Sequence, residues 1–82
     1  MYSIQIEENA KNFLKKLQKK DAEMILNKIY SIRENPFRFL KRLQGGNLWR
    51  LRISDYRAVV DVVVSANKII VLRIGHRKNV YG

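Results

Sequence analysis

The sequence predicts a small α+β domain that combines an antiparallel β-sheet with a pair of helices. Apolar residues near the N-terminus change from a spacing of two to helical spacings of three and four. The second half holds three segments rich in β-branched residues, separated by short turn signals. With 82 residues, 46% of them hydrophobic, the chain has material for one core, and we expect a single domain over residues 1–82.

The N-terminal part predicts a strand followed by a helical hairpin. Residues 2–6 alternate between apolar and polar, the period of a strand with one buried face. From Asn9 to Leu17 the apolar residues recur at helical spacing among lysines. Asp21 is expected to cap a second helix, whose apolar stripe stops before Pro36.

The C-terminal part predicts a three-stranded meander. Residues 37–46 mix aromatic and basic side chains and are interpreted as a basic connector that ends at the glycine pair, Gly45 and Gly46. The turn-prone pair Ser54-Asp55 and the triplet Ala66-Asn67-Lys68 separate the strand-like segments. The strands are expected at Leu48–Ile53, Tyr56–Val64 and Ile69–Gly75.

Turn lengths predict which residues of the meander face each other. A two-residue loop at Ser54-Asp55 pairs Ile53 with Tyr56 and places Arg52 opposite Arg57.

The second loop has two possible registers, since a slip of one residue exchanges the faces of a strand. An even loop would place Leu72 opposite Asp61 and Arg73 opposite Val60, which mixes charge into the apolar face. A three-residue loop keeps that face apolar, and we favour it. Its expected pairs are Ile70 with Val64, Leu72 with Val62, Ile74 with Val60, Arg73 with Asp61 and Arg77 with Arg57.

Charge predicts an anionic partner. The chain has a formal net charge of +10, and residues 37–82 carry ten basic but only two acidic side chains. So basic a domain repels itself unless a polyanion or an acidic partner offsets the charge, and nucleic acid is the default partner.

The composition also bounds the chemistry and the location. There is no cysteine and only one histidine, so neither a disulfide, a metal site nor a cofactor is expected. No apolar run approaches the roughly 18 residues of a membrane helix, and the N-terminus has no signal-peptide pattern. We therefore expect a cytoplasmic protein without a membrane partner.

The predicted register gathers four arginines on one surface of the sheet: Arg50, Arg52, Arg57 and Arg77. Like charges opposite each other destabilise a sheet by up to about 1 kcal/mol per pair, so the cluster suggests an anionic ligand. Guanidinium groups suit phosphate oxygens and stay charged at any physiological pH, which favours a phosphodiester. A row of arginines is also common on a merely solvated face, and this alternative stays open at this point.

Two segments, LQGGNLWRLRISDYRAVVDVV and IVLRIGHRKNVY, resemble the RelE/ParE toxin superfamily. The family signature has a leucine and a glycine before a basic strand, an aspartate-tyrosine-arginine turn, and a terminal glycine-histidine-arginine followed by a tyrosine. The corresponding residues are Leu43, Gly45, Arg50, Arg52, Asp55-Tyr56-Arg57, Gly75-His76-Arg77 and Tyr81. Residues 1–36 match only by their order of elements.

The resemblance implies a RelE-like, microbial RNase-like fold and a toxin of a type II toxin-antitoxin system. A cognate RelB-like antitoxin would neutralise it, in a heterodimer or heterotetramer. In the RelE branch such toxins cut mRNA in the ribosomal A site and so inhibit translation: the RNA 2′-hydroxyl attacks the scissile phosphate and leaves a cyclic phosphate.

Site residues carried over from the family form two groups. Arg57 and Arg77 would hold the phosphate, Arg52 would assist them in catalysis, and Tyr81 would orient the substrate or share in proton transfer. The expected RNA-binding residues are Arg50, Arg52, Arg57, His76 and Lys78.

One departure concerns the proton acceptor. Many bacterial members have lysine where this chain has Arg50 and Arg52, and an arginine that stays charged is a poor general base. Tyr81, His76 and the ribosomal RNA itself are the alternatives. Two other functions remain open, a ParE-like inhibitor of DNA gyrase and a non-enzymatic basic module that binds nucleic acid.

Overall fold

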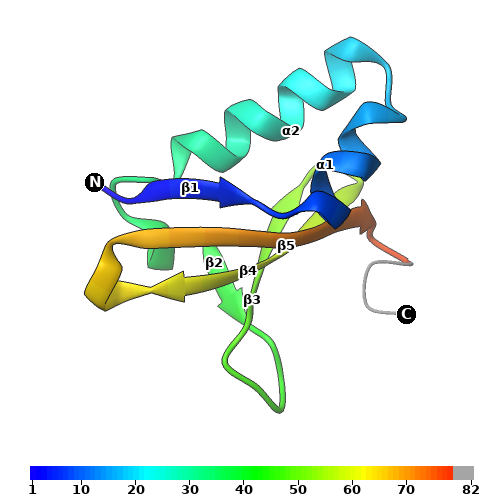
Figure 1. Ribbon diagram of the computed structural model, residues 1–82. Helices are drawn as coiled ribbons and strands as arrows, with labels where there is room; N and C mark the ends of the chain where they lie inside the picture. Colours follow the sequence, from blue (N-terminus) through cyan, green and yellow to red (C-terminus); the bar gives the residue numbers. More distant parts are fainter. Residues whose placement is uncertain (79–82) are drawn as a thin grey trace.

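Two helices lie on one side of a five-stranded sheet in the computed structural model, which describes residues 1–78 (Figure 1). The predicted α+β class, with an N-terminal strand, a helical hairpin and a C-terminal meander, is confirmed. No helix in the described part is long and apolar enough to cross a membrane. The elements are β1 (Ser3–Ile6), α1 (Glu8–Lys15), α2 (Lys19–Ser31), the 3₁₀ turn η1 (Pro36–Arg38), β2 (Leu40–Arg42), β3 (Trp49–Ile53), β4 (Tyr56–Val63), the 3₁₀ turn η2 (Val64–Ala66) and β5 (Lys68–His76).

The strands of the sheet follow the order β1-β5-β4-β3-β2. β1 runs parallel to β5 and all other neighbours are antiparallel, so the sheet is mixed. The connector predicted at residues 37–46 overlaps η1 and contains the edge strand β2, which pairs with β3. A strand of three residues is too short to reveal its alternation in sequence, and pairing with β3 determines its structure.

The second helix begins three residues earlier than a cap at Asp21 would require. Its N-cap is Gln18, whose carbonyl accepts hydrogen bonds from the N–H groups of Asp21 and Ala22 at 3.0 and 3.1 Å. The predicted cap was therefore wrong. Asp21 lies in the first turn, where its negative charge favours the positive end of the helix dipole.

The hydrophobic core lies between the helices and the face of the sheet that they cover. We call this side the helix face and the opposite side the open face. The helices contribute one stripe each, and the strands contribute every second residue. The buried core consists of Ala10, Leu14, Ile25, Ile29, Ile32, Leu40, Leu51, Ile53, Ala58, Val60, Ile69, Val71 and Ile74.

The hairpin between β3 and β4 has the predicted register. Ile53 pairs with Tyr56 and Arg52 with Arg57, across the two-residue loop Ser54-Asp55. Ser54 has φ 55°, while Asp55 is not among the residues with positive φ. A positive φ at the first loop position only is the pattern of a type II′ turn, which favours glycine there.

Replacing Ser54 with glycine should therefore stabilise the domain. A left-handed φ costs a residue with a Cβ about 1–2 kcal/mol, and glycine avoids this cost. Glycine also has greater freedom in the unfolded chain, which lowers the stability of the fold by about 0.4–1 kcal/mol and offsets part of the gain. We expect Ser54→Gly to raise the free energy of unfolding by roughly 0.5 kcal/mol and Ser54→Val to lower it, in urea denaturation. A Ser54→Gly variant less stable than wild type would contradict this turn assignment.

The register between β4 and β5 differs from the predicted one. Val62 pairs with Ile69 and Val63 with Lys68, so that η2 and Asn67 form a four-residue connection instead of a three-residue loop. Asn67, with φ 49°, takes the left-handed conformation that asparagine tolerates. The expected pairs of Arg73 with Asp61 and of Arg77 with Arg57 are therefore wrong.

A β-bulge then shifts the register within the same pair of strands. Val60 pairs with Val71, but Val59 pairs with Arg73, which leaves Leu72 without a partner. A bulge changes the alternation of one strand only. If the alternation of Lys68–Val71 continued unchanged, each residue after Leu72 would lie on the other face of the sheet from the one that it occupies.

Candidate functional site

A group of six cations is spread over β2 to β5 and the end of β5 on the open face, and we call this surface the arginine face. Alternation along the strands places the five cations of β2 to β5 there, since their Cα partners also point away from the helices. Arg77 follows directly after β5, beside the hairpin loop. One row across the sheet runs from Lys41 through Arg50 and Val59 to Arg73, and the next runs from Arg52 through Arg57 to Gly75. The cations are Lys41, Arg50, Arg52, Arg57, Arg73 and Arg77.

Arg57 occupies the centre of this surface. It lies on β4, in the middle of the sheet, with Arg52 directly opposite on one side and Gly75 on the other. The side chain is half-buried, and its Nε is buried without a hydrogen-bond partner among residues 1–78. A buried donor without an acceptor costs roughly 1–3 kcal/mol, and a movement of the side chain that lets an anionic oxygen accept its hydrogen bond would relieve this cost.

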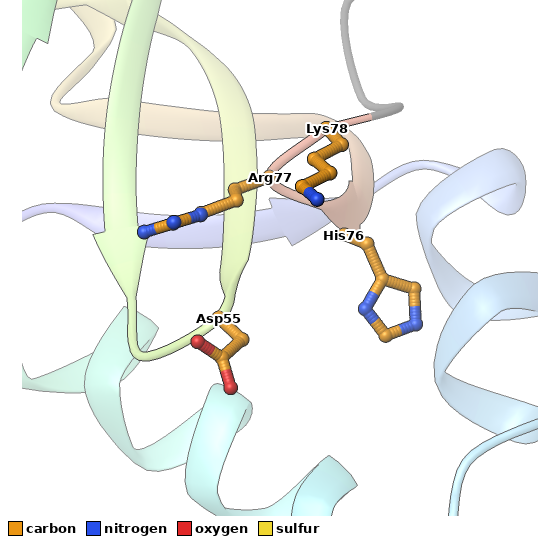
Figure 2. Close-up of a pocket in the computed structure, with 4 residues that line it drawn as sticks. All are labelled: Asp55, His76, Arg77 and Lys78. Atoms are coloured by element: carbon orange, nitrogen blue, oxygen red, sulfur yellow. The ribbon is translucent and has the colours of Figure 1, made fainter.

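Arg77 borders the same surface just beyond the end of β5. Its backbone N–H donates to the carbonyl of Asp55 at 3.0 Å, which ties the end of β5 to the hairpin loop. Among the described residues, an open pocket of about 450 Å³ is lined by Asp55, His76, Arg77 and Lys78. Figure 2 shows the Arg77 side chain directed toward β3 and β4, away from His76.

His76 points to the opposite side of the sheet from the arginine face. Its partner on β4 is Tyr56, and their ring centroids lie 4.9 Å apart. Phe13 of α1 meets the His76 ring edge-on at 6.1 Å. Backbone alternation thus separates His76 from the arginines, although it lines the pocket beside Arg77.

The other predicted site residues are placed as follows. Arg50 and Arg52 lie on β3 within the arginine face, as predicted. Lys78 is exposed and lines the pocket next to Arg77. Tyr81 lies outside the described residues.

Two members of the arginine face were not predicted. Lys41 lies on β2, a strand that was not expected, and is the Cα partner of Arg50. Arg73 was expected opposite Asp61, but the bulge places it opposite Val59. Neither position carries a local signal in the sequence, because each depends on pairing between strands.

The positive charge of the arginine face is not neutralised within the described chain. The only ion pair within 4.0 Å among residues 1–78 joins Lys19 and Glu23 on α2. Arg52 and Arg57, which face each other, repel by up to about 1 kcal/mol. Such an array can bind a phosphodiester and stabilise negative charge that develops on it.

Residues that could hold a metal ion do not gather in the described part of the chain. Within residues 1–78 no group of three or more His, Cys, Asp or Glu side chains lies close together.

Comparison with known families gives a match over nearly the whole chain. Residues 4–81 match the model of a family described as "ParE toxin of type II toxin-antitoxin system, parDE". No curated protein matches the chain significantly.

Solved structures with the same fold include chains of toxin-antitoxin complexes. The chain is similar to one in the RelBE2 complex of Mycobacterium tuberculosis, with a TM-score of 0.83 and 20% identity over 93% of this chain and 98% of that one. A chain of the intact RelBE complex of E. coli has a TM-score of 0.75 and 25% identity, over 93% and 96%. A chain of the RelE-RelB complex of Pyrococcus horikoshii has a TM-score of 0.80 and 24% identity, over 95% and 97%.

Proposed function

Because this chain belongs to the RelE/ParE superfamily of toxins from type II toxin-antitoxin systems, we propose that it is a ribosome-dependent endonuclease that cuts mRNA. The observation that carries this proposal is the arginine face with Arg57 at its centre. A binding surface for a gyrase subunit would not need a half-buried guanidinium whose Nε lacks a partner among residues 1–78, whereas a phosphate oxygen fills that need.

In the proposed reaction the scissile phosphate lies between Arg57 and Arg77. The RNA 2′-oxygen forms a bond to phosphorus while the bond from phosphorus to the 5′-oxygen breaks, which leaves a 2′,3′-cyclic phosphate. Negative charge grows on the non-bridging oxygens, and guanidinium groups already in place stabilise it. Arg52, next to Arg57 on β3, adds to this stabilisation.

Proton transfer falls to groups other than the arginines. The 2′-hydroxyl must lose a proton and the departing 5′-oxygen must gain one, and a guanidinium that remains charged serves neither step well. We assign these roles to Tyr81 or to the ribosomal RNA. His76 stacks on Tyr56 on the other side of the sheet, and together with Lys78 it is proposed to contact RNA at the rim of the pocket.

The proposed partners are a RelB-like antitoxin, which binds the toxin, and mRNA in the ribosomal A site. The structural neighbours from three organisms are toxin-antitoxin complexes, which supports the first partner. An antitoxin with acidic side chains would also offset the charge of the arginine face.

Primer extension on an mRNA in a reconstituted translation system tests the proposal, with wild type and Arg77→Ala compared in the presence and absence of ribosomes. We expect cuts by the wild type that require ribosomes and that disappear in the variant. The variant should still fold and bind its antitoxin. A fully toxic Arg77→Ala protein would contradict the assignment.

The matched family model favours a second candidate, a ParE-like toxin that blocks DNA gyrase. On this alternative the mRNA stays intact while toxicity is retained, and purified toxin inhibits DNA supercoiling by gyrase. Binding to RNA that falls steeply with salt and yields no product would instead indicate a non-enzymatic nucleic-acid-binding module.

A further inference from the structure

Arg73 reaches the arginine face only because of the bulge in β5. Ile69 and Val71 face the helices, so an unbroken alternation would turn Arg73 into the core beneath them. The bulge leaves Leu72 unpaired and turns Arg73 to the open face, where its Cα partner is Val59. Bulges near functional sites commonly re-aim a side chain in this way.

Arg73 ends a row of side chains that lies beside the row of Arg57. The first row crosses four strands through Lys41, Arg50, Val59 and Arg73. The row of Arg57 lies two residues away along β4, about 6.6 Å at the usual rise of a strand. This separation is comparable with that of neighbouring phosphates in an RNA strand.

Val59 is a buried apolar residue between the two arginines of the row. It is only 3% exposed, yet it lies on the open face and is not part of the core cluster. Its Cα partners are Arg50 and Arg73, whose long aliphatic stems can cover it while their charged ends stay in solvent. The two arginines thus flank Val59 from β3 and β5.

Neither arginine is neutralised within the described chain. Asp61 is diagonal to Arg73, since its own partner on β5 is Ile70, and no ion pair within 4.0 Å forms on this face among residues 1–78. Arg73 is exposed and Arg50 half-buried. Both can therefore accept an anion from solvent.

We propose that Arg50 and Arg73 form a second phosphate-binding site, which holds the RNA phosphate next to the scissile one. The inference rests on the proposed function insofar as Arg57 and Arg77 bind the scissile phosphate. Contacts to a neighbouring phosphate fix the position of the strand and add affinity. Arg73 is thus a binding residue that sets the register of the RNA on the sheet.

Binding of a short RNA that cannot be cut tests this site. The probe is a fluorescein-labelled 2′-O-methyl oligonucleotide, whose anisotropy is measured over a series of salt concentrations. Arg73→Ala should weaken binding about tenfold at low salt, the order expected for loss of a charged hydrogen bond. It should also reduce the slope of the logarithm of the binding constant against the logarithm of the salt concentration, the salt slope, by about 0.7. This is the value for one phosphate contact on a single strand.

Two further variants separate the site from a general effect of charge. Lys20→Ala removes one positive charge from the exposed surface of α2 and should leave affinity and slope almost unchanged. Arg73→Lys keeps the charge and should restore the slope. An Arg73→Ala protein with the affinity and slope of the wild type would overturn the proposal.

Neutral methylphosphonate linkages, placed one at a time along the probe, locate the contact. At the linkage that Arg73 binds, the neutral linkage and Arg73→Ala remove the same contact. The losses of binding free energy that they cause should therefore not add. The corresponding linkage for Arg57→Met should be the adjacent one. The proposal would also be overturned if the losses of binding free energy added at every linkage, or if Arg73→Ala and Arg57→Met failed to add at the same linkage.

Cleavage assays distinguish this inference from the proposed function. If the wild type cuts mRNA, Arg73→Ala should raise KM and leave kcat unchanged. If the wild type cuts no mRNA but the probe results hold, the nuclease assignment fails while the second phosphate site stands. Cleavage by wild type with no effect of Arg73→Ala on KM would reject the second site alone.

Discussion

Replacement of Arg57 by methionine is expected to reduce mRNA cleavage by about 10²–10³-fold, the usual loss when one preorganised donor to a developing oxyanion is removed. Methionine keeps an unbranched apolar stem in the half-buried position and removes only the guanidinium group. The effect should appear in kcat for single-turnover cleavage on programmed ribosomes, because the guanidinium acts most strongly on the transition state.

The same variant should be more stable than the wild type. It removes the repulsion between Arg57 and Arg52, worth up to about 1 kcal/mol, and a buried Nε without a partner among residues 1–78. A gain of about 1 kcal/mol would raise the melting temperature by roughly 4–8 °C. Loss of activity with a gain in stability cannot be attributed to misfolding.

Arg38→Met is the matched control for this experiment. Arg38 is exposed on η1, outside the arginine face, so cleavage should stay close to that of the wild type. Wild-type cleavage by Arg57→Met would show that no phosphate binds at the centre of the sheet.

Two adjacent isoleucines of β5 should respond very differently to truncation. Ile69 is fully buried beneath the helices, and its replacement by alanine is expected to cost about 2–5 kcal/mol. Ile70 is half-buried on the open face, opposite Asp61, and the same replacement should cost about 1 kcal/mol. Urea denaturation of the two variants measures both values.

This comparison also tests the register of β4 and β5. A three-residue loop would place Ile70 on the apolar face, whereas the observed four-residue connection places Ile69 there. An Ile70→Ala protein less stable than Ile69→Ala would reject the observed register.

Sequence reasoning succeeded where a local signal determines the geometry. The pair Ser54-Asp55 between two strand-like segments specifies a two-residue hairpin, and this turn alone places Arg52 opposite Arg57. Both helices were located from their apolar spacing. The cap at Asp21 was misassigned because the backbone carbonyl of Gln18, which any residue could supply, begins the helix.

Sequence reasoning failed where the register depends on pairing between strands and not on a local turn signal. No composition rule distinguishes the loop 66–68 from η2 followed by Asn67, and nothing local marks Leu72 as a bulge. Arg77 nevertheless lies on the predicted side of the sheet. After the bulge, Arg57 pairs with Gly75 instead of Arg77, and a shift of two residues leaves each side chain on the same face. The four predicted arginines thus share one surface although one of their pairings was wrong.

The position of β5 in the sheet determines when the toxin fold can form during synthesis. β5 is the last described strand to be translated, yet it lies between β1 and β4 and packs against α1. A nascent chain that lacks it can build the meander from β2 to β4, but β1 and α1 have no partner to join. Arg73 is also supplied by this strand. Neither the native sheet nor the complete arginine face can therefore form before β5 has been synthesised.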